Sequence, residues 1–190
     1  MQVEQFVMAY YAEQDRLRAL LPEGFVSLRP VLRINAEVRD GVQGYVEFNT
    51  AAEKDGQRGW RNLGHWDDAA VTKEGKTTLF AAGALRISFT GVGVEGGCPA
   101  EKDNAGCFFA QEGGYVLRLA EAIDQKKEFC DCEFSWEMEG GAHGVSEGKN
   151  LPAVPTPAQK NYPKEECTEE NAARIPCRQV GGTYRAQFER

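Results

Sequence analysis

A two-residue alternation of apolar and polar side chains runs through Leu28-Arg-Pro-Val-Leu-Arg-Ile-Asn-Ala-Glu-Val38. This period is that of a β-strand, in which successive side chains point to opposite faces. One face carries Leu28, Leu32, Ile34, Ala36 and Val38, and the other carries Arg29, Arg33, Asn35 and Glu37. The stretch therefore predicts a long strand with one apolar and one polar face.

A second alternating stretch runs from Glu128 to Met138. A slip of one residue would turn a whole apolar set to the other face, so such a pattern specifies its register strongly. We expect the apolar set to be buried and the acidic residues between its members to be mainly exposed. The apolar set is Cys130, Cys132, Phe134, Trp136 and Met138, and the acidic residues are Asp131, Glu133 and Glu137.

Seven further stretches have strand character, and turn pairs such as Glu74-Gly75 separate several of them. Helical patterns are confined to Ala12–Leu21 and to a short turn from Thr168 to Arg174. About nine or ten short strands at this spacing are typical of a barrel or a sandwich. We expect a mainly β fold, a closed or nearly closed antiparallel barrel with one N-terminal helix, as a single domain over residues 1–190. The further strands are Val3–Tyr10, Gly44–Thr50, Trp60–Trp66, Leu85–Thr90, Gly106–Ala110, Tyr115–Leu119 and Thr183–Glu189.

The composition excludes several classes of partner. The chain has 190 residues and a net charge of −7, and it shows no basic stripe for nucleic acid. No run approaches the roughly 18 apolar residues of a membrane span, so we expect no membrane partner. The segment Met1–Phe6 lacks the regions of a signal peptide, and we expect a cytoplasmic protein with its six cysteines reduced. The oligomeric state stays open, a homo-oligomer included.

Motifs for metals and nucleophiles do not stand out. A structural zinc site prefers cysteine pairs with two to four residues between them. Cys130 and Cys132 have one residue between them, and Cys98 and Cys107 bracket a long glycine-rich loop. The sequence has no G-x-S-x-G elbow that would present a serine nucleophile to either histidine. We therefore expect no metal and no cofactor.

Three segments near the N-terminus follow a recognisable order. They are Tyr10-Tyr-Ala-Glu-Gln-Asp-Arg-Leu-Arg-Ala-Leu-Leu-Pro-Glu-Gly-Phe25, Arg29-Pro-Val-Leu-Arg-Ile-Asn35 and Gly44-Tyr-Val-Glu47. A helix that ends in a Leu-Pro-Glu step is followed by a Pro-led strand and a Tyr-x-Glu step. This order resembles the opening of the acetoacetate decarboxylase superfamily and covers about a quarter of the chain. The resemblance implies a β-barrel around a mostly apolar cavity.

In that family, a lysine in a dry pocket forms a Schiff base with a β-keto acid. The imine then takes up the electrons that carbon dioxide leaves behind. The glutamate of the Tyr-x-Glu step belongs to the active site, and Glu47 matches it. A second family acid, on the Pro-led strand, falls on Asn35.

The lysine motif of the family is not present here. It reads Gly-Arg-Glu, followed by an aromatic residue and Pro-Lys-Lys. The nearest echo runs from Gly93 to Lys102 and has Ala100 and Glu101 at the two lysine positions. An alternative alignment uses Thr72-Lys-Glu-Gly-Lys76, which lacks the proline.

The resemblance implies a barrel that binds a small keto or carboxylic acid in an interior cavity, without an intact Schiff-base lysine motif. For catalysis it implies Glu47 and Lys102, and for substrate binding it implies Arg33, Asn35 and Glu95. If the protein is an enzyme, it would be a decarboxylase-like lyase. Two alternatives stay open. The barrel could bind a ligand or partner without chemistry, and composition alone favours a polar face turned to solvent.

We predict that the protein forms no productive Schiff base with acetoacetate. Such a lysine must be neutral near neutral pH, and lowering its pKa from about 10.4 takes roughly 4–5 kcal/mol. Glu101 and Asp103 flank Lys102 and favour its charged form. Borohydride treatment in the presence of acetoacetate should give no adduct in an intact mass spectrum. A reduced adduct on a single lysine, with carbon dioxide released when borohydride is omitted, would make the protein a decarboxylase.

Overall fold

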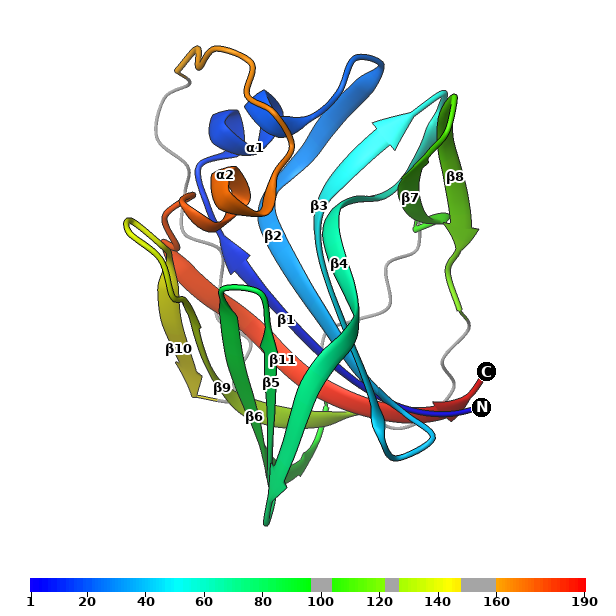
Figure 1. Cartoon of the computed structure of the whole chain (residues 1–190), viewed down its shortest axis with the longest axis vertical. Coiled ribbons are helices and arrows are strands. Elements are labelled where there is room, and N and C mark those ends of the chain that lie inside the picture. Colours follow the sequence, from blue (N-terminus) through cyan, green and yellow to red (C-terminus); the bar gives the residue numbers. More distant parts are fainter. Residues whose placement is uncertain (97–103, 122–126, 148–159) are drawn as a thin grey trace.

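The computed structural model describes residues 1–96, 104–121, 127–147 and 160–190. This part of the chain forms eleven strands and two helices (Figure 1). In chain order they are β1 Gln2–Tyr11, α1 Gln14–Leu20, β2 Phe25–Arg39, β3 Gln43–Lys54, β4 Gln57–Glu74, β5 Thr77–Ala82, β6 Leu85–Glu95, β7 Gly106–Gln111, β8 Gly114–Leu119, β9 Glu128–Trp136, β10 His143–Glu147, α2 Glu169–Ala173 and β11 Gln179–Glu189.

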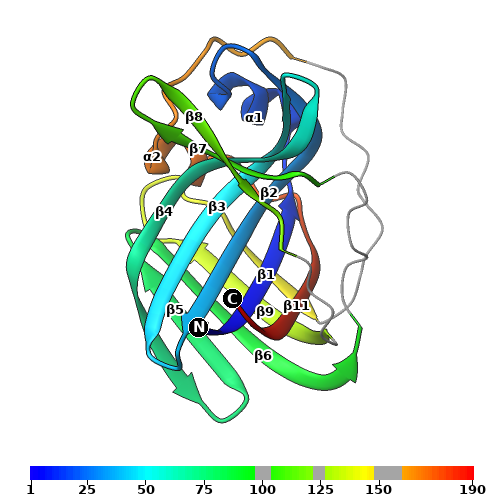
Figure 2. The same ribbon diagram turned by 90° about the vertical axis from the view of Figure 1, so that its right-hand side faces the viewer.

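Eight of the described strands close into a ring. Their order is β3-β2-β1-β11-β9-β6-β5-β4, and β4 pairs with β3 to complete the circle. Every pairing in the ring is antiparallel. Figure 2 shows the strands winding obliquely around the barrel, with the two termini side by side at one end. The expected fold class, a mainly β closed antiparallel barrel, is confirmed.

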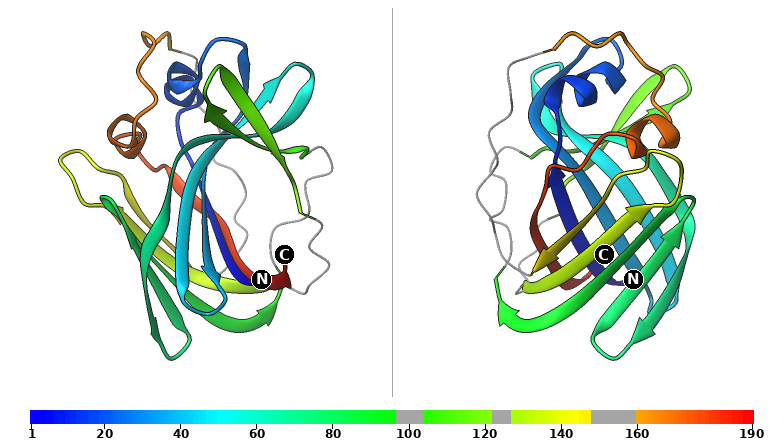
Figure 3. Two further views of the ribbon diagram at one scale, coloured as in Figure 1. Left: turned by 45° about the vertical axis from the view of Figure 1, so that its right-hand side comes forward. Right: turned by 90° about the vertical axis from the view of Figure 1, so that its left-hand side faces the viewer.

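The β7–β8 hairpin lies outside this ring and extends a sheet from the first half of β4 (Figure 3). On the edge of β4 that faces away from β3, β7 pairs at Trp60 and Arg61, and β5 pairs from Ala70 onward. The strands approach closely where β7 begins. A Cβ on Gly59 would lie 2.3 Å from the carbonyl oxygen of Gly106, so this approach requires glycine at position 59.

The interior of the ring is a continuous apolar core. Both helices and the ring strands contribute to it, and Tyr10 stacks on Phe134 with 4.8 Å between ring centroids. Four members of the apolar set of β2 belong to this core, as the alternation predicts: Leu32, Ile34, Ala36 and Val38. The prediction is wrong for Leu28, which is partly buried and packs with Val31 and Trp60 instead, because the register of β2 against β3 shifts between Ser27 and Leu32.

The strand expected over 128–138 has the predicted phase but ends earlier, at Trp136. The cysteines and aromatic residues of its apolar set are at most 3% exposed, and the three acidic residues are exposed. Met138 is only partly buried, because it lies beyond the end of β9, where the strand alternation no longer applies. The prediction is confirmed for the strand and wrong for Met138.

The polar face of β2 is buried as well. Asn35 and Glu37 are only 6% and 2% exposed. Cys107 of β7 and Arg190, directly after β11, contact polar residues on this side of β2 and β3. A solvent-facing position, which composition favours for the polar set, is therefore wrong for Asn35 and Glu37, whereas Arg29 is exposed.

Both helices begin and end inside the ranges expected for them. The Oγ1 of Thr168 accepts a hydrogen bond at 3.1 Å from the backbone N–H of Asn171, which caps α2. In the part of the chain that the structure describes, no helix has the length and apolar character to cross a membrane.

Glu37 ties the last residue of the chain to β2. The Nη1 and Nη2 groups of Arg190 donate to its two carboxylate oxygens at 3.1 and 2.9 Å, and Arg39 Nε donates at 2.7 Å. Burial alone would raise the pKa of Glu37, but these guanidinium groups hold the pKa below its usual value. Arg190 also contacts Glu121, which follows β8. The contacts of Arg190 with Glu37 and Glu121 therefore join β2, the segment after β8 and the residue after β11.

We predict that Glu37→Gln destabilises the protein at neutral pH by about 1–3 kcal/mol, because it removes the negative charge and one of the two acceptor oxygens that Arg39 and Arg190 contact. A carboxylate whose pKa is lowered in the folded protein stabilises the fold fully at pH values above its unfolded-state pKa of about 4.3. This stabilisation is lost as the pH falls through the pKa of the folded state. The difference in melting temperature between wild type and variant should therefore shrink below about pH 4. Glu189→Gln, at an exposed position of β11, is the matched control. A difference that stays constant down to about pH 3 would contradict the assignment.

We also predict that Cys130 and Cys132 of the native protein react slowly with thiol reagents. They are 0% and 3% exposed, and burial raises the pKa of Cys130 to about 12 and that of Cys132 well above its usual range. The thiolate is the reactive form, so both burial and protonation slow the reaction. Labelling followed by peptide mass mapping, with and without denaturant, measures this. Rapid labelling of both residues in the native protein would contradict it.

Candidate functional site

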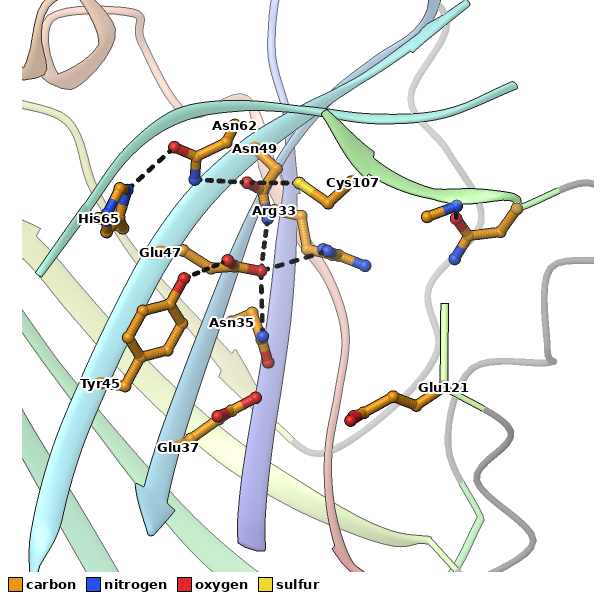
Figure 4. Close-up of polar contacts among 12 residues, drawn as sticks. Arg33, Asn35, Glu37, Tyr45, Glu47, Asn49, Asn62, His65, Cys107 and Glu121 are labelled. Carbon is orange, nitrogen blue, oxygen red and sulfur yellow. Dashed lines mark hydrogen bonds and ion pairs between the residues drawn. The ribbon is translucent and has the colours of Figure 1, made fainter. Parts of the chain in front are cut away.

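The polar side chains of β2 and β3 gather on the outer face of the ring (Figure 4). Val46 and Phe48 of β3 belong to the core, so Glu47 between them points to the opposite face. The register places Asn35 directly across from Glu47, and Arg33 lies on the same face two residues earlier. The structure therefore brings these three predicted residues together. Their expected place in an interior cavity is wrong, because apolar side chains fill the interior and the strand period turns the polar set outward.

The Glu47 carboxylate is 6% exposed and surrounded by donors. Tyr45 Oη donates to Oε2 at 2.6 Å, and the Nδ2 groups of Asn35 and Asn49 each donate to Oε1 at 3.1 Å. Arg33 Nη2 lies 3.7 Å from the same Oε1. Removing a carboxylate from water costs several kcal/mol unless it is paired and hydrogen-bonded. These four groups offset that cost and hold the carboxylate in one orientation.

Tyr45 acts as a hydrogen-bond donor in this cluster. Burial raises the pKa of its hydroxyl far above the usual range, and the neighbouring Glu47 carboxylate adds to the rise. The guanidinium of Arg39 packs over its ring at 3.9 Å from the centroid. Tyr45 is therefore a neutral phenol at physiological pH, and its proton points to Glu47.

A chain of amide contacts leads from Glu47 toward the rim of the site. Asn49 Oδ1 accepts a hydrogen bond from Asn62 Nδ2 at 3.0 Å, and Cys107 Sγ lies 3.5 Å from the same oxygen. Asn62 Oδ1 in turn lies 3.2 Å from Nδ1 of the partly exposed His65. These contacts connect β3, β4 and β7 around one carboxylate, as Figure 4 shows.

Arginine side chains surround Cys107 on β7. Arg118 lies directly across from it in the β7–β8 ladder. Burial raises the pKa of the Cys107 thiol to about 12, and Glu47 adds to the rise, whereas the guanidinium groups of Arg33, Arg61 and Arg118 act in the opposite direction. Three cations therefore act on this thiol against one carboxylate. Cys107 itself is protonated at neutral pH and is no nucleophile.

The Arg33 guanidinium is held in place from two sides. It contacts Glu47 and packs over the Trp60 ring at 4.1 Å from the centroid. Trp60 pairs with Cys107 where β4 and β7 run side by side in parallel. This pairing forms one side of the site around Arg33. Arg33 Nε is buried and has no hydrogen-bond partner among the described residues. A guanidinium in this state is pre-oriented for an anion.

Glu95 does not join this group. It lies exposed at the end of β6, across from Glu128 of β9, and β1, β11 and β9 separate β6 from β2 in the ring. Lys102 lies outside the described residues. Of the predicted site residues, Arg33, Asn35 and Glu47 form one cluster, and the placement of Glu95 with them is wrong.

Sequence reasoning missed Tyr45, Asn49, Asn62 and Cys107. Tyr45 and Asn49 lie two positions before and after Glu47, so the alternation of β3 would have found both. Asn62 and Cys107 come from other strands, and no local pattern marks them. Among the described side chains, no three or more of His, Cys, Asp and Glu gather as metal ligands would. The chemistry available in this cluster is anion binding by arginine and proton acceptance by a carboxylate.

Several solved structures share this fold. The acetoacetate decarboxylase of Legionella pneumophila subsp. pneumophila str. Philadelphia 1 aligns with a TM-score of 0.52 and 12% identity, over 98% of this chain and 81% of that one. The enduracididine biosynthesis enzyme MppR, in complex with pyruvate, aligns with a TM-score of 0.50 and 10% identity, over 98% and 84%. A further acetoacetate decarboxylase structure aligns with a TM-score of 0.50 and 12% identity, over 98% and 82%.

No protein-family model and no curated protein matches the chain. At 10–12% identity, a structural likeness concerns the fold and not the function. The fold agrees with the order of segments in the first quarter of the sequence. This chain folds as an acetoacetate decarboxylase-like β-barrel.

Proposed function

We propose that this protein binds a small organic acid on the polar face of β2 and β3, with Arg33 as the group that holds the carboxylate of the ligand. The observation that carries the proposal is the state of this arginine. Its guanidinium is fixed by Glu47 and Trp60, and its buried Nε has no partner among the described residues. A buried donor without an acceptor is costly, and a bound carboxylate would remove that cost.

The local charge supports an anionic ligand. The whole chain has a net charge of −7, which repels anions at long range. Around Cys107, however, three guanidinium groups oppose the single carboxylate of Glu47. These guanidinium groups act locally against the long-range field of the chain. A small anion would be drawn to this face rather than to the rest of the surface.

The structural relatives support the size and class of the ligand. Two of the similar structures are acetoacetate decarboxylases, and a third protein, MppR, is described in complex with pyruvate. All of these names refer to small carboxylic acids or to an enzyme that acts on one. The transfer to this chain rests on the fold together with the arginine cluster described above.

Decarboxylation is the second candidate. Glu47, at the position of the family's Tyr-x-Glu glutamate, would be its acid–base group. An imine would need a neutral lysine in the same cluster, and the cations with described contacts to Glu47 and Cys107 are arginines. We therefore place binding ahead of lyase chemistry, and borohydride trapping with acetoacetate distinguishes the two.

We predict that acetoacetate, pyruvate and propanoate bind to the purified protein, whereas the neutral isostere propanamide does not. Arg33→Gln should weaken the binding of each acid about 10- to 100-fold, because a hydrogen bond to a charged group contributes about 1.5–3 kcal/mol. Isothermal titration calorimetry measures both effects. Arg174→Gln, which removes a surface arginine that pairs with Glu170 on α2, is the matched control and should bind as wild type does.

Two outcomes would overturn the proposal. One is that no acid binds with a Kd below about 10 mM. The other is that Arg33→Gln binds every acid as tightly as wild type while its melting temperature and circular dichroism are unchanged. The second outcome would leave a ligand site elsewhere on the molecule.

A further inference from the structure

The Oδ1 of Asn35 is a buried acceptor without a partner. Asn35 is 6% exposed, and no described residue donates a hydrogen bond to this oxygen. The orientation of its amide is determined by Glu47, because only the Nδ2 end can donate to a carboxylate. Oδ1 must therefore point away from Glu47.

Asn49 shows what the unpaired oxygen of Asn35 lacks. Both amides donate to Glu47 Oε1 at 3.1 Å, so both have the same orientation toward the carboxylate. The Oδ1 of Asn49 accepts from Asn62 Nδ2 at 3.0 Å and lies 3.5 Å from Cys107 Sγ. The two amides therefore differ at their oxygens: that of Asn49 accepts a hydrogen bond, and that of Asn35 has no partner among the described residues.

The unpaired acceptor lies on the same face of β2 as the unpaired donor of Arg33, and the amide oxygen of Asn35 is turned toward Glu37 (Figure 4). Arg33 and Asn35 are two residues apart on one face of β2, and both contact the same oxygen, Glu47 Oε1, at 3.7 and 3.1 Å. A ligand that satisfies both must present an acceptor to Arg33 and a donor to Asn35 within a few atoms of each other. A carboxylate is the acceptor already proposed for Arg33.

We infer that the ligand is a small hydroxy acid, whose carboxylate binds Arg33 and whose hydroxyl donates to Asn35 Oδ1. This inference rests on the proposed function and specifies its ligand. A keto acid has no donor to offer and would leave the buried acceptor unpaired, which a polar site penalises strongly. An amino acid also has a donor beside its carboxylate, so alanine is the rival ligand in the test below.

The test is a matched series of ligands titrated calorimetrically into the whole protein. Propanoate, pyruvate, lactate and alanine share a three-carbon skeleton and differ only in the group beside the carboxylate. Butanoate, acetoacetate and 3-hydroxybutanoate repeat the comparison with the group one carbon further away. We expect the hydroxy acid to bind at least about tenfold more tightly than the keto acid and the unsubstituted acid of its series.

Two near-isosteric variants isolate the contribution of the acceptor. Asn35→Leu and Asn49→Leu each remove one amide donor from Glu47 Oε1, but only Asn35→Leu removes the unpaired oxygen. Asn35→Leu should abolish the preference for the hydroxy acid over the unsubstituted and the keto acid of its series. Asn49→Leu should retain the preference. Circular dichroism and melting curves establish that both variants fold, and the wild-type series decides the question if either does not.

The outcomes separate this inference from the function on which it rests. Equal or tighter binding of pyruvate than of lactate, or tighter binding of alanine, overturns the hydroxy-acid assignment while the acid-binding proposal stands. Loss of the preference in Asn49→Leu but not in Asn35→Leu overturns the role of Asn35. If no acid in either series binds, both the proposed function and this inference fail.

Discussion

The burial of both faces of β2 and β3 is the constraint on which the rest of the structure depends. Antiparallel strands commonly bury one face and leave the other in water. Here the inner face packs into the apolar core of the ring, and the outer face is covered from β7 and from the end of the chain. Asn35, Glu37, Glu47 and Asn49 on the outer face have therefore lost their water. Each must find a partner within the protein or in a ligand.

Glu47 shows how this constraint organises the site. Its carboxylate takes donors from both neighbouring positions of its own strand, Tyr45 and Asn49, and from Asn35 across the ladder. Each donor is then oriented by the carboxylate, so the free end of every amide points in a defined direction. The arrangement follows from one desolvated charge. The unpaired donor of Arg33 and the unpaired acceptor of Asn35 are held in place as firmly as the paired groups.

The fold and the function rest on different observations. The barrel is shared with acetoacetate decarboxylases at 12% identity, and such a likeness transfers architecture without transferring chemistry. The chemistry depends on the side chains that line the polar face. The cations with described contacts to Glu47 and Cys107 are guanidinium groups, which suit recognition of a carboxylate. A Schiff-base mechanism would need an amine in addition to them.

The sequence by itself determined most of the strand phases and the helix positions, because side-chain alternation is a local property. The resemblance to a family, and not the alternation, grouped Glu47 with Arg33 and Asn35. The sequence also indicated the barrel, through the number and spacing of its strands. It did not decide which side of the ring the polar set faces. That depends on ring closure, which turns the larger apolar set inward and leaves the polar set outside.

Only the tertiary structure decided that the outer face is buried and which distant residues complete it. Cys107 reaches Asn49 across 58 residues because β7 pairs with β4 in parallel, and no local pattern encodes that pairing. The exclusion of Glu95 from the site has the same origin, since its strand occupies another part of the ring. Contacts between residues far apart in the chain arise from the closure of the sheet, which the free energy of the whole fold determines.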